Sequence, residues 1–182
     1  MNTQELSANL QSLDQKAQSM GQSIQRYMSE ASSYRRQGYE YEQMAQSAMS
    51  SIYSSDEEDD YEQKSEQASR YMDEAARCYS MADQAESQAD YLRGELRGIR
   101  SEYEYYMNEG HTNLANLQIA VQSLTGASSS KYGRDKLSQA LQSTRQRIVF
   151  NQNLVSGCQK RIAWIDQICG AGGDQYNKVL RR

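Results

Sequence analysis

Residues 6–52 read LSANLQSLDQKAQSMGQSIQRYMSEASSYRRQGYEYEQMAQSAMSSI, and this stretch decides the fold. Apolar or small residues recur in it at alternating steps of four and three, a spacing that places them in one row along an α-helix. The row consists of Leu6, Leu10, Leu13, Ala17, Met20, Ile24, Tyr27, Ala31, Tyr34, Gly38, Tyr41, Ala45, Ala48 and Ile52. It predicts a helix over about residues 3–54, in which the row alone is roughly 70 Å long at a rise of 1.5 Å per residue. The frequent alanines predict that a second helix packs closely against this row.

The composition favours helix throughout. The 182 residues contain no Pro, which turns and edge strands normally use. No apolar run approaches the roughly 20 residues that cross a bilayer, and the start MNTQELSANL has neither the basic nor the apolar part of a signal peptide. We therefore expect a protein that is cytoplasmic, or exported by a leaderless route.

A second row of small and apolar residues predicts a helix over residues 57–109. It runs through Tyr61, Ala68, Met72, Ala75, Tyr79, Ala82, Ala85, Ala89, Leu92, Leu96, Ile99, Tyr103 and Tyr106, with one three-residue slip at Ala85 that overwinds a coiled coil locally. We expect this helix to fold back antiparallel on the first, so that the numbers of facing residues sum to roughly 114. Ala45 then lies near Ala68, and Ile24 near Ala89.

An acidic turn is expected between these two helices, at Ser54–Asp60. Ser55 and Glu58 fit the capping box that begins a helix, and acidic side chains are favoured there by the helix dipole. A calcium loop is the alternative, but the stretch lacks the D-x-D-x-D-G order and its central glycine.

The remaining chain predicts a continuation of the second helix and a third long helix. The stretch Asn108–Asn113 resembles a helix C-cap at Gly110 followed by the N-cap of a new helix. The row resumes after it over 112–125, so the helix either breaks or kinks near residue 111. A Gly/Ser-rich loop over 126–130 precedes a helix over 130–169, and glycines at 170–173 end it. Residues 1–173 are thus predicted to form one all-α domain, an antiparallel coiled-coil hairpin plus a third helix in an elongated three-helix bundle. We expect residues 174–182 to fray.

The third helix carries a second apolar row beside its main one. The main row is Leu137, Leu141, Thr144, Ile148, Asn151, Val155, Cys158, Ile162, Ile165 and Cys169, and the second row is Phe150, Leu154, Gly157, Arg161, Trp164 and Ile168. One interpretation is that this helix contacts both neighbours in a three-helix bundle. The other is a docking face for a partner, with Phe150, Leu154, Gly157, Trp164 and Ile168 as its residues, since large aromatics are favoured anchors at interfaces.

Gly94 and Gly98 lie four residues apart inside the second predicted helix. Each glycine costs up to about 1 kcal/mol relative to alanine in a helix, so the pair suggests close backbone packing or a kink. The alternative is a stretch of weak helix that the fold tolerates.

Charge is segregated along the chain. Residues 1–60 carry 10 acids and 4 bases, residues 61–125 carry 11 and 6, and residues 126–182 carry 3 and 10. The simplest interpretation is that the basic segment complements the two acidic helices within the chain. Nucleic acid and membrane are disfavoured as partners, because the whole chain is acidic and its bases are not interleaved with aromatics.

No catalytic, cofactor or metal site is predicted. Cys78, Cys158 and Cys169 show no metal-ligand spacing, and His111 is the only histidine, with no nucleophile placed beside it by a recognised motif. We expect a protein that is not an enzyme.

The Gln/Ser/Ala/Tyr-rich helical hairpin of residues 1–125 resembles the helical substrates and accessory proteins of type VII secretion, the WXG100 and LXG-associated group. The defining Trp-x-Gly turn of that group is absent, because the turn here is Ser54–Asp60 and Ile165 and Asp166 follow the lone Trp164. The resemblance implies a chaperone-like or co-secreted partner that packs its hairpin against a helical component.

The sequence therefore predicts a non-enzymatic protein–protein interaction protein, a helical adaptor whose partner is another helical protein or itself. The alternative function is a self-assembling structural coiled-coil rod that forms a filament or a closed oligomer.

Overall fold

A computed structural model describes residues 3–52, 58–126 and 131–170, and all of them are helical. The helices are α1 (Thr3–Ile52), α2 (Glu58–Gly126) and α3 (Lys131–Gly170). The predicted all-α class with three long helices is therefore confirmed. Packing divides the chain into two compact units with the boundary between Gly94 and Glu95. Unit 1 contains α1 and the first half of α2, and unit 2 contains the second half of α2 and α3.

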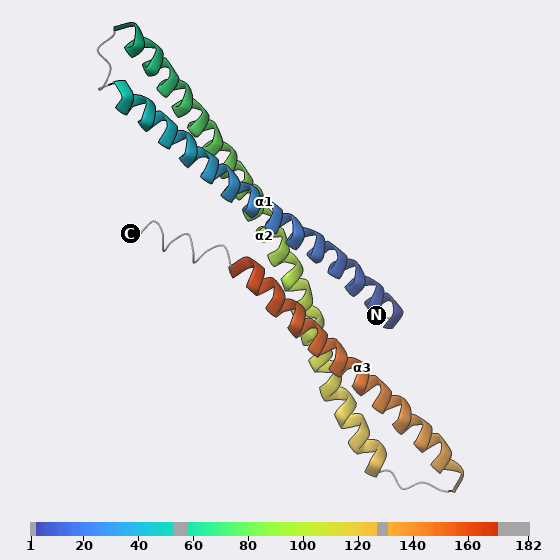
Figure 1. The fold of residues 1–182 in the computed structure, drawn as a ribbon. Coiled ribbons are helices and arrows are strands. Elements are labelled where there is room, and N and C mark those ends of the chain that lie inside the picture. The colour runs from blue at the N-terminus through green and yellow to red at the C-terminus, as the bar shows by residue number, and fades with distance from the viewer. Residues whose placement is uncertain (1–2, 53–57, 127–130, 171–182) are drawn as a thin grey trace. The chain divides into compact units, whose positions relative to one another are not determined.

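Unit 1 is an antiparallel pair of helices (Figure 1). The Lys64 ammonium donates to the Ser51 carbonyl oxygen at 3.4 Å. Further along the pair, the rings of Tyr41 and Tyr71 stack with centroids 6.3 Å apart, and an Arg35 Nη2–H donates to Glu86 at 2.8 Å. The residue numbers of the first two pairs sum to within two of the predicted 114, whereas the long Arg35 side chain reaches about two turns further along α2. The predicted antiparallel register agrees with the first two contacts.

Alanines form most of the buried row in unit 1. Ala31, Ala82 and Ala85 make one buried cluster, against which Tyr27 and Tyr34 pack. Other buried members are Leu6, Leu13, Ala17, Ile24, Ala45, Ala68, Ala75, Cys78 and Ala89. Because alanine places only a methyl group between the helices, the two backbones can approach closely.

Two members of the predicted second row do not lie in this core. Tyr61 is 59% exposed and Met72 is 52% exposed, whereas Ala68 and Ala75 are buried. Where the helices meet over alanines, there is no room between them for a larger side chain, and Tyr61 and Met72 are displaced to the edge.

Gly38 shows how close the helices of unit 1 come. A Cβ added at Gly38 would lie 2.9 Å from Cε1 of the Tyr79 ring and 3.0 Å from its Cζ. Contacts that short do not occur between real side chains, so the ring occupies the space that any larger residue at position 38 needs.

Unit 2 is also an antiparallel pair, formed by the second half of α2 and α3 (Figure 1). Arg100 donates to Asp166 at 2.6 Å, and the guanidinium of Arg161 lies 5.7 Å from the ring centroid of Tyr103. The core is made of larger side chains than in unit 1. Its buried members are Leu96, Ile99, Tyr103, Tyr106, Leu117, Leu154, Val155, Cys158 and Ile165.

The helix does not break near residue 111. Residues 108–113 are helical, and the Thr112 hydroxyl donates to the Asn108 carbonyl oxygen at 3.1 Å within that continuous helix. Gly110 is buried, and a Cβ added there would lie 2.9 Å from Cγ2 of Val155 on α3. The glycine therefore serves close packing between α2 and α3, and the predicted C-cap at this position is wrong.

Several predictions fall on residues outside the described ranges. They are the acidic turn with its capping box, most of the loop over 126–130, the glycines beyond Gly170 and the C-terminal residues 174–182. The helix ends that border these segments, at Ile52, Glu58, Gly126, Lys131 and Gly170, lie within two residues of the predicted ones.

Candidate docking surface

The second row of α3 divides into buried and exposed members. Leu154 is 8% exposed, Trp164 is 37% exposed, and Phe150, Gly157 and Ile168 are intermediate. The five residues therefore do not form one open face. What remains accessible on this row is Phe150, Trp164 and Ile168, which we call the Trp164 surface.

Leu154 belongs to the core of unit 2. Its Cδ2 lies 3.4 Å from the position that a Cβ on Gly110 would take. A side chain that fills the space over a glycine of the neighbouring helix is held inside the unit, so Leu154 is not available to a partner.

Gly157 makes room for a side chain of its own helix. A Cβ added at Gly157 would lie 2.7 Å from Nη1 of Arg161. The Arg161 guanidinium in turn lies over the ring of Tyr103, a cation–π arrangement. This glycine therefore lets Arg161 fold back along α3, and it does not open a path for a partner helix.

Trp164 keeps more than a third of its surface accessible although it neighbours Ile165, which is 0% exposed. Phe150 precedes it by 14 residues, about 21 Å along the helix at 1.5 Å per residue. Two aromatic side chains at this separation could anchor a bound helix at two points about four turns apart.

Close packing at Gly94 and Gly98 is not found among the described residues. A Cβ added at either position would meet nothing within 4 Å, and both residues are exposed on α2. The glycines that do permit close approach are Gly38 and Gly110. The sequence signals both glycines by their position, because Gly38 and Gly110 continue the spacing of the buried rows. A glycine in such a row faces the partner helix, whereas a glycine on the opposite side of the helix faces solvent.

Sequence reasoning missed a groove along unit 1. Met44 and Ala48 of α1 and Tyr71 of α2 line it, together with Tyr39, Glu40, Gln43, Ser47, Ser51 and Gln67. Tyr39 is 58% exposed and Met44 is 48% exposed. Except for Ala48, these residues lie beside the predicted row, and a row assignment does not show which flanking side chains stay uncovered.

The arginines of unit 1 are all paired with carboxylates, although some of its carboxylates have no cation partner among the described residues. All six of its arginines form ion pairs with carboxylates, namely Arg26, Arg35, Arg36, Arg70, Arg77 and Arg93. Arg35 links the two helices, since its Nη2 lies 2.8 Å from Glu86 and 3.5 Å from Asp83.

Tyr79 adds a polar contact on α2 in unit 1. Burial raises the pKa of the Tyr79 phenol, and a hydrogen bond with the Glu42 carboxylate raises it further. The neutral phenol can donate to that carboxylate, whereas a phenolate would be repelled by it.

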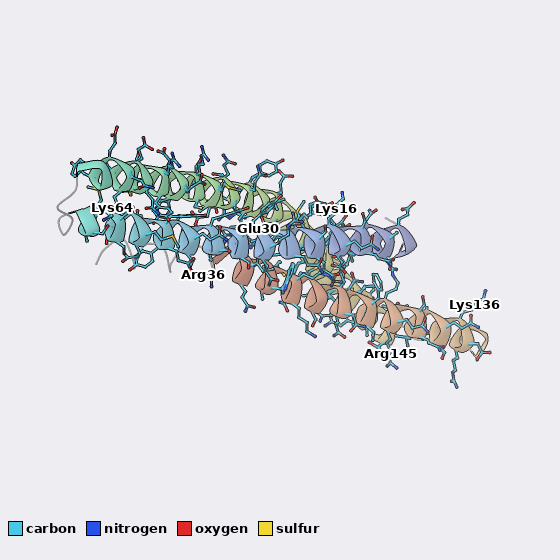
Figure 2. The ribbon with its side chains drawn as sticks, turned by 45° about the horizontal axis from the view of Figure 1, so that its top comes forward. Lys16, Glu30, Arg36, Lys64, Lys136 and Arg145 are labelled. Atoms are coloured by element: carbon cyan, nitrogen blue, oxygen red, sulfur yellow. The ribbon has the colours of Figure 1, made fainter. Side chains whose placement is uncertain are left out.

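The cations of α3 differ from those of unit 1. Arg134, Lys136, Arg145, Arg147 and Lys160 are exposed, and within the described ranges none of them forms an ion pair. Figure 2 shows Lys136 and Arg145 projecting from α3. One ion pair between α2 and α3 joins Arg100 of α2 to Asp166, a carboxylate of α3. The expected neutralisation of α3 by acidic helices is therefore not seen inside unit 2.

The described residues offer neither a metal-ion site nor a membrane-spanning helix. No group of three or more His, Cys, Asp or Glu side chains there could hold a metal ion. His111 is exposed on α2. No helix in the described part of the chain is both long and apolar enough to span a membrane.

Comparison of the chain with known proteins gives no further assignment. No family model, no curated protein and no solved structure matches it.

Proposed function

We propose that the chain is a non-enzymatic protein–protein interaction protein, a helical adaptor or chaperone-like partner that binds another helix at the Trp164 surface. The observation that carries this proposal is that the only Trp of the chain stays 37% exposed on α3. Tryptophan is the residue type most enriched among energetically dominant interface residues.

The pairing of the helices supports this proposal. Each unit is a pair, and a helix in a pair buries one stripe of its surface and leaves the rest accessible. Large apolar side chains remain exposed on all three helices, including Met44 on α1, Ile119 on α2 and Val149 on α3. An amphipathic helix recognises such surfaces through anchors spaced by three, four and seven residues.

A role beside a type VII secretion system is the narrower form of this proposal. It is supported by the antiparallel hairpin of α1 with the first half of α2, the feature on which the resemblance is based. In this form the chain is a co-secreted or accessory partner of a helical toxin or secretion component.

The Trp164 surface is tested with the single tryptophan as probe. Intrinsic fluorescence is recorded as the full chain is titrated with a candidate helical partner captured from its own cells. We expect the emission of Trp164 to shift to shorter wavelength on binding. We expect Trp164→Ala with Phe150→Ala to weaken binding at least tenfold, as at an interface anchor.

Ile119→Ala is the matched control, because Ile119 is a large exposed side chain of unit 2 that lies outside the Trp164 surface. Unchanged affinity in the Trp164/Phe150 variant, together with a large loss of stability, would show that both residues serve the core and would exclude the site.

A self-assembling structural rod is the second candidate. It is favoured by the exposed apolar side chains on every helix and by the separation of charge between the units. Light scattering on the pure chain across a hundredfold dilution tests it, and a species that remains at 20.8 kDa throughout excludes it.

A further inference from the structure

The division of charge coincides with the structural division of the chain. Residues 1–94 carry 17 acids and 8 bases, a formal charge of −9, and residues 95–182 carry 7 acids and 12 bases, a formal charge of +5. Most of the positive charge is on α3, where seven bases accompany two acids. The two units are therefore electrostatically complementary surfaces on one polypeptide.

Part of the unpaired charge of α3 gathers on one side of the helix. At 3.6 residues per turn, Arg134, Arg145, Val149 and Lys160 fall within about 80° of arc, and we call them the basic face. All four are exposed, and Val149 is 55% exposed. A shallow hollow lies on this face, lined by Ser138, Leu141, Gln142, Arg145, Gln146 and Val149. The face thus combines cations with an apolar side chain and a depression.

A surface of opposite charge and similar apolar character lies on α2 in unit 1. Tyr61, Glu62, Met72 and Asp73 fall within about 120° of arc, and we call them the acidic face. Tyr61 is 59% exposed and Met72 is 52% exposed. Glu62 and Asp73 are exposed, and neither has an ion-pair partner among the described residues. Each large apolar side chain is therefore followed directly by an unpaired carboxylate.

We propose that the acidic face of one copy of this chain docks on the basic face of a second copy. Opposite charges steer the two faces together and fix their pairing, while contacts of Tyr61 and Met72 with the surface around Val149 supply apolar burial. The contact is heterologous, because it joins two different faces, so each copy of a dimer formed by one such contact still offers one free face. Such contacts propagate into an open filament or close into a ring.

This inference rests on the second candidate function, self-assembly, and names the faces that would meet. It uses no residue of the Trp164 surface. A chain that binds a separate partner through Trp164 and remains monomeric would therefore disprove this inference and leave the adaptor proposal in place.

The test is sedimentation velocity on the full chain over a hundredfold dilution, at low salt and at 0.5 M NaCl. We expect concentration-dependent association that weakens at high salt, since exposed charges are screened there. R145E/K160E reverses the basic face and E62K/D73K reverses the acidic face. We expect each double variant alone to associate at least tenfold more weakly than the natural chain.

An equimolar mixture of the two double variants is the decisive sample. In this mixture the face made negative by R145E/K160E can meet the face made positive by E62K/D73K, so their charges are again opposite. We expect the association affinity to return to within about threefold of the natural chain. Loss of folding in either variant cannot produce this recovery, and helicity measured by circular dichroism accompanies each sample.

K136E/R147E is the matched control. It changes the charge of the same helix by the same amount as R145E/K160E, but Lys136 and Arg147 lie about 160° or more around the helix from Arg145. We expect its association to stay within about threefold of the natural chain. A natural chain that is monomeric at every concentration, a control as defective as R145E/K160E, or a mixture that does not recover would each overturn the proposal.

Discussion

Unit 1 and unit 2 are both antiparallel helix pairs, yet different side chains hold them together. The largest fully buried side chains among the described residues, Tyr103, Leu96, Ile165 and Cys158, all belong to unit 2. The most buried positions of unit 1 are alanines, such as Ala82 and Ala89. Unit 1 also pairs all its arginines with carboxylates, while five cations of α3 have no such partner within the described residues. The comparison shows that one backbone arrangement can be stabilised by close backbone approach in one place and by side-chain volume in another.

Truncation of a core side chain in unit 2 is the largest effect that we expect. Ile165 is 0% exposed, and Ile165→Ala should lower the free energy of unfolding by about 2–5 kcal/mol through lost burial and a residual cavity. Urea unfolding followed by circular dichroism measures this change. Val149→Ala on the same helix is the control and should change stability by less than about 0.5 kcal/mol. Equal effects of the two substitutions would contradict a core built on side-chain volume.

In unit 1, where the helices are in close contact, we expect an enlarged side chain at a glycine to lower stability. We expect Gly38→Ala to lower the free energy of unfolding by about 1–2 kcal/mol, because displacement of the Tyr79 ring costs more than the helix propensity gained. Gly94→Ala is the matched control, since nothing lies within 4 Å of its added Cβ, and it should raise stability by about 0.5–1 kcal/mol. Thermal unfolding of both variants checks the signs. A stabilising Gly38→Ala would show that the helices are not in close contact there.

The smallest effect that we expect is a pH dependence of the free energy of unfolding of unit 1. The pKa of Tyr79 is raised in the folded chain, mainly by burial and then by Glu42, so the unfolded chain loses this proton first as pH rises. The stabilisation that Tyr79 contributes is fully present below the ordinary phenol pKa of about 10. It is lost as the pH rises through the higher pKa of Tyr79 in the folded chain. Chemical unfolding between pH 9 and 11 measures it as the difference between the natural chain and Tyr79→Phe. If the difference in free energy of unfolding between the natural chain and Tyr79→Phe does not change with pH, then Tyr79 does not contribute a pH-dependent stabilisation.

Much of the fold could be predicted from the sequence, because the period of four and three reports directly which side of a helix is buried. Ile24, Ala45, Ala68 and Ala89 are buried in unit 1 as their rows predicted, and the hairpin register follows from them. The continuous helix at Gly110 was not predicted, because glycine also ends helices, and only the position of Gly110 in the buried row distinguishes a helix end from close packing under Val155.

The candidate docking surface was harder to predict than the core. The second row on α3 was visible, but whether each member is covered depends on tertiary packing. Leu154 is buried because Gly110 leaves space for it, while Trp164 remains partly exposed. The unpaired cations of α3 were visible as sequence charge, yet only the structure shows that α2 places no carboxylate against Arg145 or Lys160 within unit 2.

The placement of the boundary between Gly94 and Glu95 has a consequence for synthesis of the protein. Each unit is one uninterrupted stretch of chain, so its contacts join residues that are near in sequence, a topology that folds fast. Translation proceeds from the N-terminus at about 5–20 residues per second, and α1 can therefore pair with the first half of α2 before α3 has been made. The acidic unit would then be complete while the basic helix is still on the ribosome.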